Sequence, residues 1–324
     1  MRQAQSQRAS SARRKAPPLL AGFVLAGLSL AAAACGGPQA GAAAPAPSSQ
    51  SPSPGASAGA GTGAGSLSPG LPPVAGAPYK QAPGWQLAWQ DNFSTRRSLK
   101  PWVYRTGGTG WGLNQLQMYT PGGAKVAGGA LTLTAAKAHV PGCWDGTCAY
   151  TSQRLSTLGT YSRTYGVFEA RIKVPMASGL WPAFWLEGTD VSQVSWPACG
   201  EIDVEEAPGF RPNLAQGFAH GPGFNHNGQY QLATPLSAGY HVYGVDWTPA
   251  GITWFVDGHA YSHVSTAGIA AFTRPFYITL NLAVGGKWPG SPKPSTRFPA
   301  HMDVDWVRVF SPAHHHGGPK HHHG

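Results

Sequence analysis

The sequence predicts an all-β domain built as a sandwich or a barrel of short strands. Three observations support this. Short segments alternate between apolar and polar side chains, or are rich in β-branched and aromatic residues. Glycine and proline, 44 and 30 of the 324 residues, separate these segments as turns. No long segment has the helical period of 3.6 residues, which argues against an α-helical fold.

Residues 1–34 have the composition of an export signal. Five of the 23 basic residues lie in the first fifteen positions, and an uncharged apolar run of sixteen residues follows over 19–34. The run is shorter than the ~20 residues of a membrane span. It ends in three alanines before Cys35, which resembles a bacterial lipoprotein signal with Cys35 as the lipidated residue. We expect an exported protein, lipid-anchored to the outer face of the membrane in the cell envelope. A signal peptide cleaved after an alanine, giving a secreted protein, is the alternative.

The chain on either side of the predicted domain lacks the composition of a core. Residues 35–80 are mostly Ala, Gly, Pro and Ser, which predicts a flexible linker. Residues 312–324 form a His-rich tail, to which we assign no catalytic role. A loose metal site, a solvated end and an expression remnant are its alternatives. The folded and catalytic domain is therefore expected over 81–311.

Within this domain, five strands are predicted from alternation or from apolar runs. In a strand over residues 167–174, Phe168 and every second residue after it are predicted to face inward. Glu169, Arg171 and Lys173 are predicted to face outward. Asp257-Gly258, directly after the predicted strand 251–256, is a strong hairpin signal. The five strands are expected over 130–134, 167–174, 251–256, 276–284 and 302–310.

The charge and the cysteines restrict the partners and the compartment. The net charge of +10 is concentrated at the N-terminus, since residues 80–310 carry 17 basic and 13 acidic residues. We see no basic stripe, and we expect a monomer without a nucleic-acid partner. Cys143 and Cys148 bracket a turn-like tetrapeptide and can form a disulfide, which suits an oxidising compartment. Cys199 is then free, although its pairing with either of them stays open.

The densest cluster of acidic residues is the segment 201–206, Glu-Ile-Asp-Val-Glu-Glu, which holds four of the thirteen acids. As a regular strand it places Glu201, Asp203 and Glu205 on one face. Crowded carboxylates raise each other's pKa values, and carboxylates with split pKa values perform glycoside hydrolysis. A solvated sheet edge or a cation site is the alternative. Tryptophans on both sides of the segment, which can stack on sugar rings, favour the glycosidase interpretation.

These motifs together resemble glycoside hydrolase family 16, particularly its laminarinase-like endo-β-1,3-glucanases. The resemblance covers residues 83–311 and implies a β-jelly-roll sandwich of two antiparallel sheets, with a concave substrate cleft. The matching stretches, in order, are 111–120, 165–171, 181–185, 200–206, 220–223, 243–249, 256–258, 281–286 and 304–309.

The resemblance implies a retaining mechanism with Glu201 as nucleophile and Asp203 as the carboxylate between the two catalytic groups. The family uses either E-x-D-x-E on a regular strand or E-x-D-x-x-E, in which a β-bulge brings the later Glu onto the shared face. This chain offers both Glu205 and Glu206 as the general acid/base. Because Glu206-Ala207-Pro208-Gly209 has the glycine spacing of the bulged form, we predict Glu206. Glu205 then occupies a position that is usually apolar.

The resemblance also implies other site residues. Those expected to bind substrate are Trp181, Trp185, Trp196, His220, Asn114, Arg154, Asn281 and Trp288. For the tryptophans and the histidine, core packing or a structural role is the alternative. Many members carry a structural calcium ion, for which Asp305 and Asp91 are the candidate ligands. No cofactor is expected for the chemistry.

The function implied is hydrolysis of internal β-1,3-glucosidic bonds of laminarin-like glucans through a covalent glycosyl-enzyme intermediate. Alternatives on the same fold are a mixed-linkage β-1,3-1,4-glucanase, a galactan-active hydrolase and a transglycosylase. A non-catalytic glucan-binding module is the alternative of another class. The complete set of carboxylates argues against it, because a binding module has no use for three crowded acids.

Overall fold

The computed structural model describes residues 84–94 and 99–313. Nearly all of their regular structure is β-strand. The strands are β1 (Trp85–Asp91), β2 (Val103–Tyr104), β3 (Gln117–Tyr119), β4 (Lys125–Ala127), β5 (Ala130–Pro141), β6 (Thr147–Ser152), β7 (Arg154–Ser156), β8 (Gly166–Lys173), β9 (Leu180–Gly188), β10 (Glu201–Glu206), β11 (Leu214–Gly221), β12 (Phe224–Gln231), β13 (His241–Trp247), β14 (Gly251–Val256), β15 (His259–Ser265), β16 (Phe276–Val284) and β17 (Ala300–Pro312). The helices are α1 (Val191–Val194) and two 3-10 turns, Pro121–Gly123 and Ala270–Thr273.

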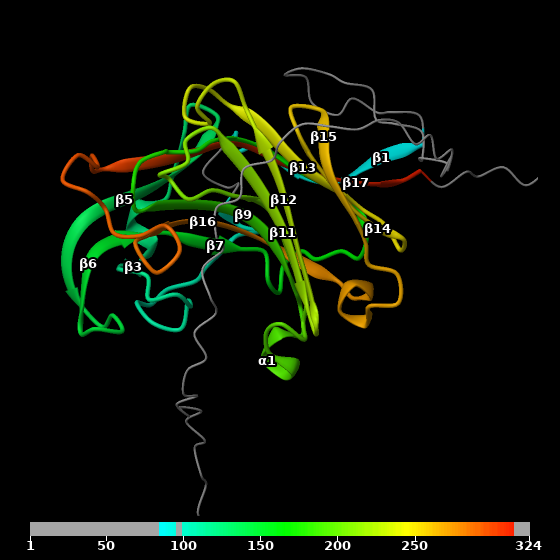
Figure 1. The fold of residues 1–324 in the computed structure, drawn as a ribbon, viewed down its shortest axis with the longest axis horizontal. Helices are drawn as coiled ribbons and strands as arrows, with labels where there is room; N and C mark the ends of the chain where they lie inside the picture. Colours follow the sequence, from blue (N-terminus) through cyan, green and yellow to red (C-terminus); the bar gives the residue numbers. More distant parts are fainter. Residues whose placement is uncertain (1–83, 95–98, 314–324) are drawn as a thin grey trace, which may run out of the picture. The chain divides into compact units, whose positions relative to one another are not determined.

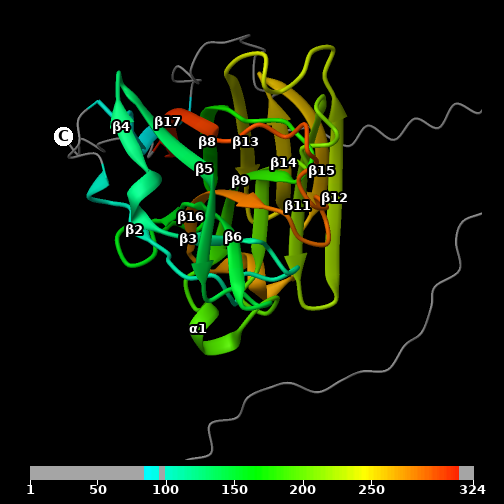
Figure 2. The same ribbon diagram turned by 90° about the vertical axis from the view of Figure 1, so that its left-hand side faces the viewer.

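The strands form two sheets that pack face to face (Figures 1 and 2). The seven-stranded sheet has the order β12-β11-β10-β9-β16-β7-β2. The ten-stranded sheet has the order β15-β14-β13-β8-β17-β5-β6-β3, with β1 paired to β17 and β4 to β5. The pairing is antiparallel except between β3 and β6. The predicted all-β sandwich is therefore confirmed, and β10, the acidic segment, lies inside the seven-stranded sheet.

All five predicted strands are present, with ends that differ by a few residues. The Asp257-Gly258 turn joins β14 to β15, and both residues have positive φ, 49° and 78°, as a tight hairpin turn requires. The prediction that Glu169 faces solvent is wrong, because its side chain is only 1% exposed. Glu169 is opposite Arg308 on the neighbouring β17, in the interior of the ten-stranded sheet. Strand alternation identifies the face of a residue but not whether neighbouring side chains cover it.

The core lies between the sheets and fixes the position of the acidic strand. Ile202 and Val204 of β10 point into this core and are almost fully buried. Trp254, on β14 of the opposite sheet, donates a hydrogen bond across the core from Nε1 to the backbone oxygen of Asp203 at 2.8 Å. The indole fits because Gly217 on β11 has no side chain, and a Cβ there would lie 2.2 Å from Trp254 Cδ1. The middle of β10 is thus anchored by both sheets.

Among the cysteines that the structure describes, Cys143 and Cys148 form a disulfide, and Cys199 is free and buried. None of the helices that the structure describes has the length and apolar character needed to span a bilayer. The predicted signal (1–34) with its lipidation site Cys35, the linker (35–80) and the His-rich tail from residue 314 lie outside the described residues.

Candidate active site

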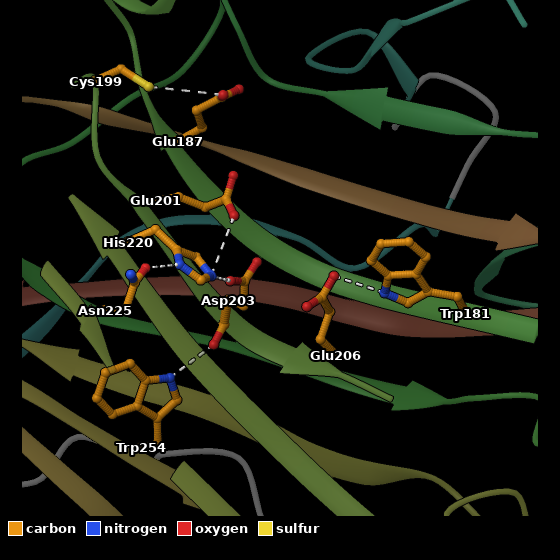
Figure 3. A network of polar contacts seen from close by, with 9 residues as sticks. All are labelled: Trp181, Glu187, Cys199, Glu201, Asp203, Glu206, His220, Asn225 and Trp254. Atoms are coloured by element: carbon orange, nitrogen blue, oxygen red, sulfur yellow. Dashed lines mark hydrogen bonds and ion pairs between the residues drawn. The ribbon is translucent and has the colours of Figure 1, made fainter. Parts of the chain in front are cut away.

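A β-bulge determines which acids of β10 share a face. Against the neighbouring β9, Asp203 is opposite Trp185, Glu205 is opposite Phe184 and Glu206 is opposite Ala183. Two steps along β10 therefore correspond to one step along β9, so the alternation changes phase after Asp203. Glu205 points with Phe184 toward the core, whereas Glu206 lies on the same face as Glu201 and Asp203 (Figure 3). We call this outward side of the seven-stranded sheet the catalytic face.

Glu205, with 1% of its surface exposed, is a carboxyl group buried on the core side of the strand. Burial raises its pKa well above the usual range, and the charge of Glu206 raises it further. Protonation makes Glu205 a neutral polar side chain, which is how a glutamate can occupy a position that faces an apolar core.

On the catalytic face Asp203 is buried, Glu201 and Glu206 are half-buried, and the charges of the three acids repel each other. Burial raises the pKa of Asp203 to about 8, with a further contribution from Glu187. Burial is the largest cause that raises the pKa of Glu201, and the charge of Asp203 is the next. The same two causes, in the same order, raise the pKa of Glu206. The Trp181 indole, which donates a hydrogen bond to Glu206 Oε1 at 2.7 Å, opposes the shift at Glu206. The cluster therefore retains protons near neutral pH and can supply both an acid and a base.

His220 faces the acids from the neighbouring strand β11, directly opposite Glu201. Its Nδ1 is 2.7 Å from Asn225 Oδ1, an acceptor, so Nδ1 carries a hydrogen and Nε2 faces the carboxylates. Nε2 is 3.5 Å from Asp203 Oδ2 and 4.0 Å from Glu201 Oε1 (Figure 3). A positive charge on His220 favours the ionised form of Glu201 and of Glu206. The predicted cleft histidine thus lies beside the acids, and Asn225 is the residue that orients it.

The predicted tryptophans Trp181 and Trp185 both lie on the catalytic face, each 8% exposed and with its indole nitrogen bonded. Trp185 Nε1 donates to Asn281 Oδ1 at 2.7 Å. The Arg154 guanidinium lies 4.5 Å from the centre of the Trp185 ring and 4.8 Å from that of Trp111. Neither tryptophan belongs to the core between the sheets. The face beside the acids is therefore made of aromatic rings fixed by hydrogen bonds and by a cation.

The remaining predicted substrate residues lie at the edges of this face. Trp288 packs edge-on against Trp181, with ring centres 5.0 Å apart. Trp196 is 55% exposed, and its ring centre is 5.8 Å from that of His220. Asn114 lines a pocket formed mainly by residues 108–115. All three can contact a polymer that crosses the face, and their substrate role stays a prediction.

The two predicted calcium ligands, Asp91 and Asp305, each have protein partners. Asp91 accepts hydrogen bonds from the Phe93 backbone and from Trp102 Nε1, each 2.9 Å long. Asp305 pairs with Arg171 at 2.6 Å. Among the described residues, ligand atoms of Glu201, Asp203 and His220 do lie within 4.8 Å of one another. The same three residues are the candidates for catalysis that the acidic segment and the resemblance predict. Calcium stays a prediction of the resemblance alone.

Glu187 is a fourth carboxylate on the catalytic face that the sequence interpretation missed. It lies on β9 directly opposite Glu201 and directly opposite Tyr277 of β16, so His220, Glu201, Glu187 and Tyr277 form one row across four strands. The Tyr277 hydroxyl donates to Glu187 Oε2, and Cys199 Sγ lies 3.9 Å from Oε1. Alternation from Trp181 through Trp185 to residue 187 would have found it.

Glu187→Gln is expected to extend activity to lower pH. The charge of Glu187 raises the pKa of Glu201, along with burial and the charges of Asp203 and Glu206, whereas His220 lowers it. Since the nucleophile must be ionised, activity declines as the pH falls through this raised pKa. Without the charge at position 187 the pKa of Glu201 falls, and the acid limb of the kcat/KM profile moves to lower pH. An unchanged acid limb, or a shift to higher pH, would refute this role.

Glu205→Gln is the matched control for that profile. It changes a buried carboxyl group of the same strand, but on the opposite face, and its charge does not act on Glu201. The acid limb of the kcat/KM profile of Glu205→Gln should coincide with that of the wild type.

The arrangement suits hydrolysis of a glycoside with retention of configuration. Retention needs one ionised carboxylate to attack the anomeric carbon and one protonated carboxyl to protonate the leaving oxygen, both on the same surface. Glu201 and Glu206 flank Asp203 on one face of one strand. Aromatic side chains beside them suit the apolar faces of sugar rings.

Comparison with known proteins agrees with this interpretation of the site. The model of glycosyl hydrolases family 16 matches residues 114–308. A β-glucanase of Rhodothermus marinus is 37% identical over 253 residues, 71% of this chain and 86% of the relative. The laminarinase catalytic domain of Thermotoga maritima superimposes with a TM-score of 0.68 at 35% identity, covering 71% of this chain and 99% of that domain. The endo-β-1,3-glucanase of Pyrococcus furiosus has a TM-score of 0.68 at 39% identity, covering 71% and 95%.

The family match extends from the pocket residue Asn114 to Arg308 and includes the bulged acidic strand, His220 and the aromatic rings of the catalytic face. The solved structures share both sheets of the sandwich with this chain. On the match and on the site together, this chain belongs to glycosyl hydrolases family 16.

Proposed function

We propose that this chain is a retaining endo-β-1,3-glucanase that hydrolyses internal bonds of laminarin-like glucans. The observation that carries the proposal is the bulge in β10, which brings Glu206 onto the face of Glu201 and Asp203. The family and the glucanases among its relatives support β-1,3-glucan as the substrate.

The roles of the acids follow from their surroundings. Glu201 attacks the anomeric carbon and forms a glycosyl-enzyme ester, while Glu206 gives its proton to the departing oxygen. Water then enters, Glu206 takes a proton from it, and the hydroxide releases the sugar from Glu201. Trp181 holds Glu206 in place through its 2.7 Å hydrogen bond. The charge of Asp203 favours the protonated form of both outer acids, and a positive charge on His220 favours their ionised form.

The substrate is tested by reducing-sugar release from laminarin, lichenan, agarose and carrageenan in parallel. We expect release from laminarin to exceed that from lichenan, with none from the two galactans. Higher activity on lichenan or on a galactan would keep the mechanism and replace the substrate. Binding without release on all four would contradict the proposal and favour the non-catalytic glucan-binding alternative.

Export and lipid anchoring are further proposals that depend on residues 1–35. They rest on the basic start, the apolar run and Cys35 in the sequence. Loss of membrane partitioning in Cys35→Ala would support the anchor, and unchanged partitioning would refute it.

A further inference from the structure

We propose that Trp144, on the disulfide loop 143–148, is a sugar-binding platform that extends the catalytic face and takes a distal glucosyl unit of a bound β-glucan. This inference rests on the proposed function, which supplies the polymer. It assigns a role to an exposed tryptophan and to a disulfide that the catalytic chemistry does not use.

Residues of the catalytic face connect the acids to Trp111, which lines the same pocket as Trp144. From Asp203 on β10 the next residue in register is Trp185 on β9, and β16 and β7 follow in the sheet order. Arg154 on β7 lies between the rings of Trp185 and Trp111, 4.5 and 4.8 Å from their centres. Three strand spacings of ~4.8 Å place β7 about 14 Å from β10. A glucan that crosses the strands at the acids is thus guided over Trp185 and Arg154 to Trp111.

Trp111 and Trp144 line the same pocket. Its walls are residues 108–115 and Trp144, and they include the Asn114 amide and the Gln115 side chain. Gln115 is fixed, because its Oε1 accepts hydrogen bonds from Gln117 Nε2 at 2.7 Å and from the Tyr119 hydroxyl at 3.2 Å. Trp144 is 52% exposed, so its ring is accessible. Indole rings beside amides, in a hollow open to water, provide the stacking surface and the hydrogen-bonding groups that a sugar needs.

The disulfide fastens Trp144 to this pocket. Cys143 forms an isolated β-bridge with Gly108, the first residue of the pocket wall. A Cβ at Gly108 would lie 2.6 Å from the Gly142 oxygen and 2.7 Å from Cys148 Sγ, so the disulfide packs directly on the Gly108 backbone. Because the bond closes a loop of only a few residues around Trp144, the backbone that carries this side chain is restrained beside the pocket before the sugar arrives. Ordering in advance lowers the entropic cost of binding.

The test separates binding at a distance from chemistry at the acids. Trp144→Ala should raise KM for laminarin about three- to tenfold, the value of one aromatic contact, with kcat unchanged. Cleavage of a short laminari-oligosaccharide, which occupies only the face near the acids, should be unaffected. Trp144→Phe should restore most of the affinity.

Leu87→Ala is the control, since Leu87 is an exposed apolar residue on β1 of the other sheet. Cys143→Ser/Cys148→Ser should raise KM for laminarin in the same way.

Binding to the inactive Glu201→Gln protein distinguishes failure of the platform from failure of the proposed function. Affinity electrophoresis of Glu201→Gln and Glu201→Gln/Trp144→Ala is run in laminarin, lichenan and agarose. Weaker retardation of the double variant in the polysaccharide that the single variant binds supports the platform, even where that polysaccharide is not laminarin. Equal retardation in all three, or an equal fall of kcat on long and short substrates, overturns it.

Discussion

Glu201→Gln is expected to lower kcat on laminarin by about 10⁴-fold or more, because glutamine cannot form the glycosyl-enzyme ester. The substitution keeps the shape of the side chain and removes the charge that repels Asp203 and Glu206. The variant should therefore fold, and it should bind laminarin about as tightly as the wild type. Initial rates of reducing-sugar release and titration with a laminari-oligosaccharide measure the two effects separately.

Glu187→Gln is the matched control for this variant. It makes the same chemical change on the neighbouring strand, directly opposite Glu201. Glu187→Gln should still hydrolyse laminarin, with only the acid limb of its pH profile moved to lower pH. Turnover by Glu201→Gln at a rate comparable to Glu187→Gln would remove Glu201 from the role of nucleophile.

Glu206→Gln is expected to lower kcat on laminarin by about 10²–10⁴-fold, whereas Glu205→Gln should stay active. The bulge gives the reason, since it places Glu206 beside Asp203 and turns Glu205 to the core with Phe184. An aryl glucoside substrate with an acidic leaving group sharpens the comparison. Its bond breaks without protonation, so the first step should be nearly normal in Glu206→Gln, and a burst of the phenol should precede slow turnover.

The opposite pattern would contradict the bulge. If Glu205→Gln folds normally but is inactive while Glu206→Gln turns over laminarin, the strand is regular in solution and Glu205 is the acid/base. Thermal denaturation of both variants shows whether a loss of activity reflects chemistry or loss of the folded state.

The strands and most of the site could be predicted because they depend on local patterns. Alternation with a period of two predicted β5, β8 and β17, apolar runs predicted β14 and β16, and Asp257-Gly258 predicted the hairpin. The same period assigns Glu205 and Glu206 to the wrong faces of β10, because a bulge changes the phase of the alternation. The residues that anchor the bulged strand are distant in the sequence. Trp254, whose indole bonds the Asp203 backbone, lies fifty-one positions away. Only the glycine spacing after the motif pointed to Glu206.

What could not be predicted depends on register between strands. Alternation along residues 181–187 puts Glu187 on the face of Trp181 and Trp185, but its significance comes from lying opposite Glu201 and Tyr277, which only the register shows. The same holds for Asn225, which orients His220 from the next strand. Arg154 was predicted as a substrate residue, but its position between two rings was not. Burial of Glu169 could not be predicted either. Alternation predicted which face of the strand it lies on, but not that neighbouring strands bury it.

The most direct test of the mechanism is the anomeric configuration of the first product, followed by proton NMR during rapid hydrolysis of laminarin. Attack by Glu201 and a second displacement by water give two inversions, so the new reducing end should appear as the β-anomer and then mutarotate. Initial appearance of the α-anomer would show a single displacement, and would contradict the assignment of Glu201 and Glu206 as a retaining pair.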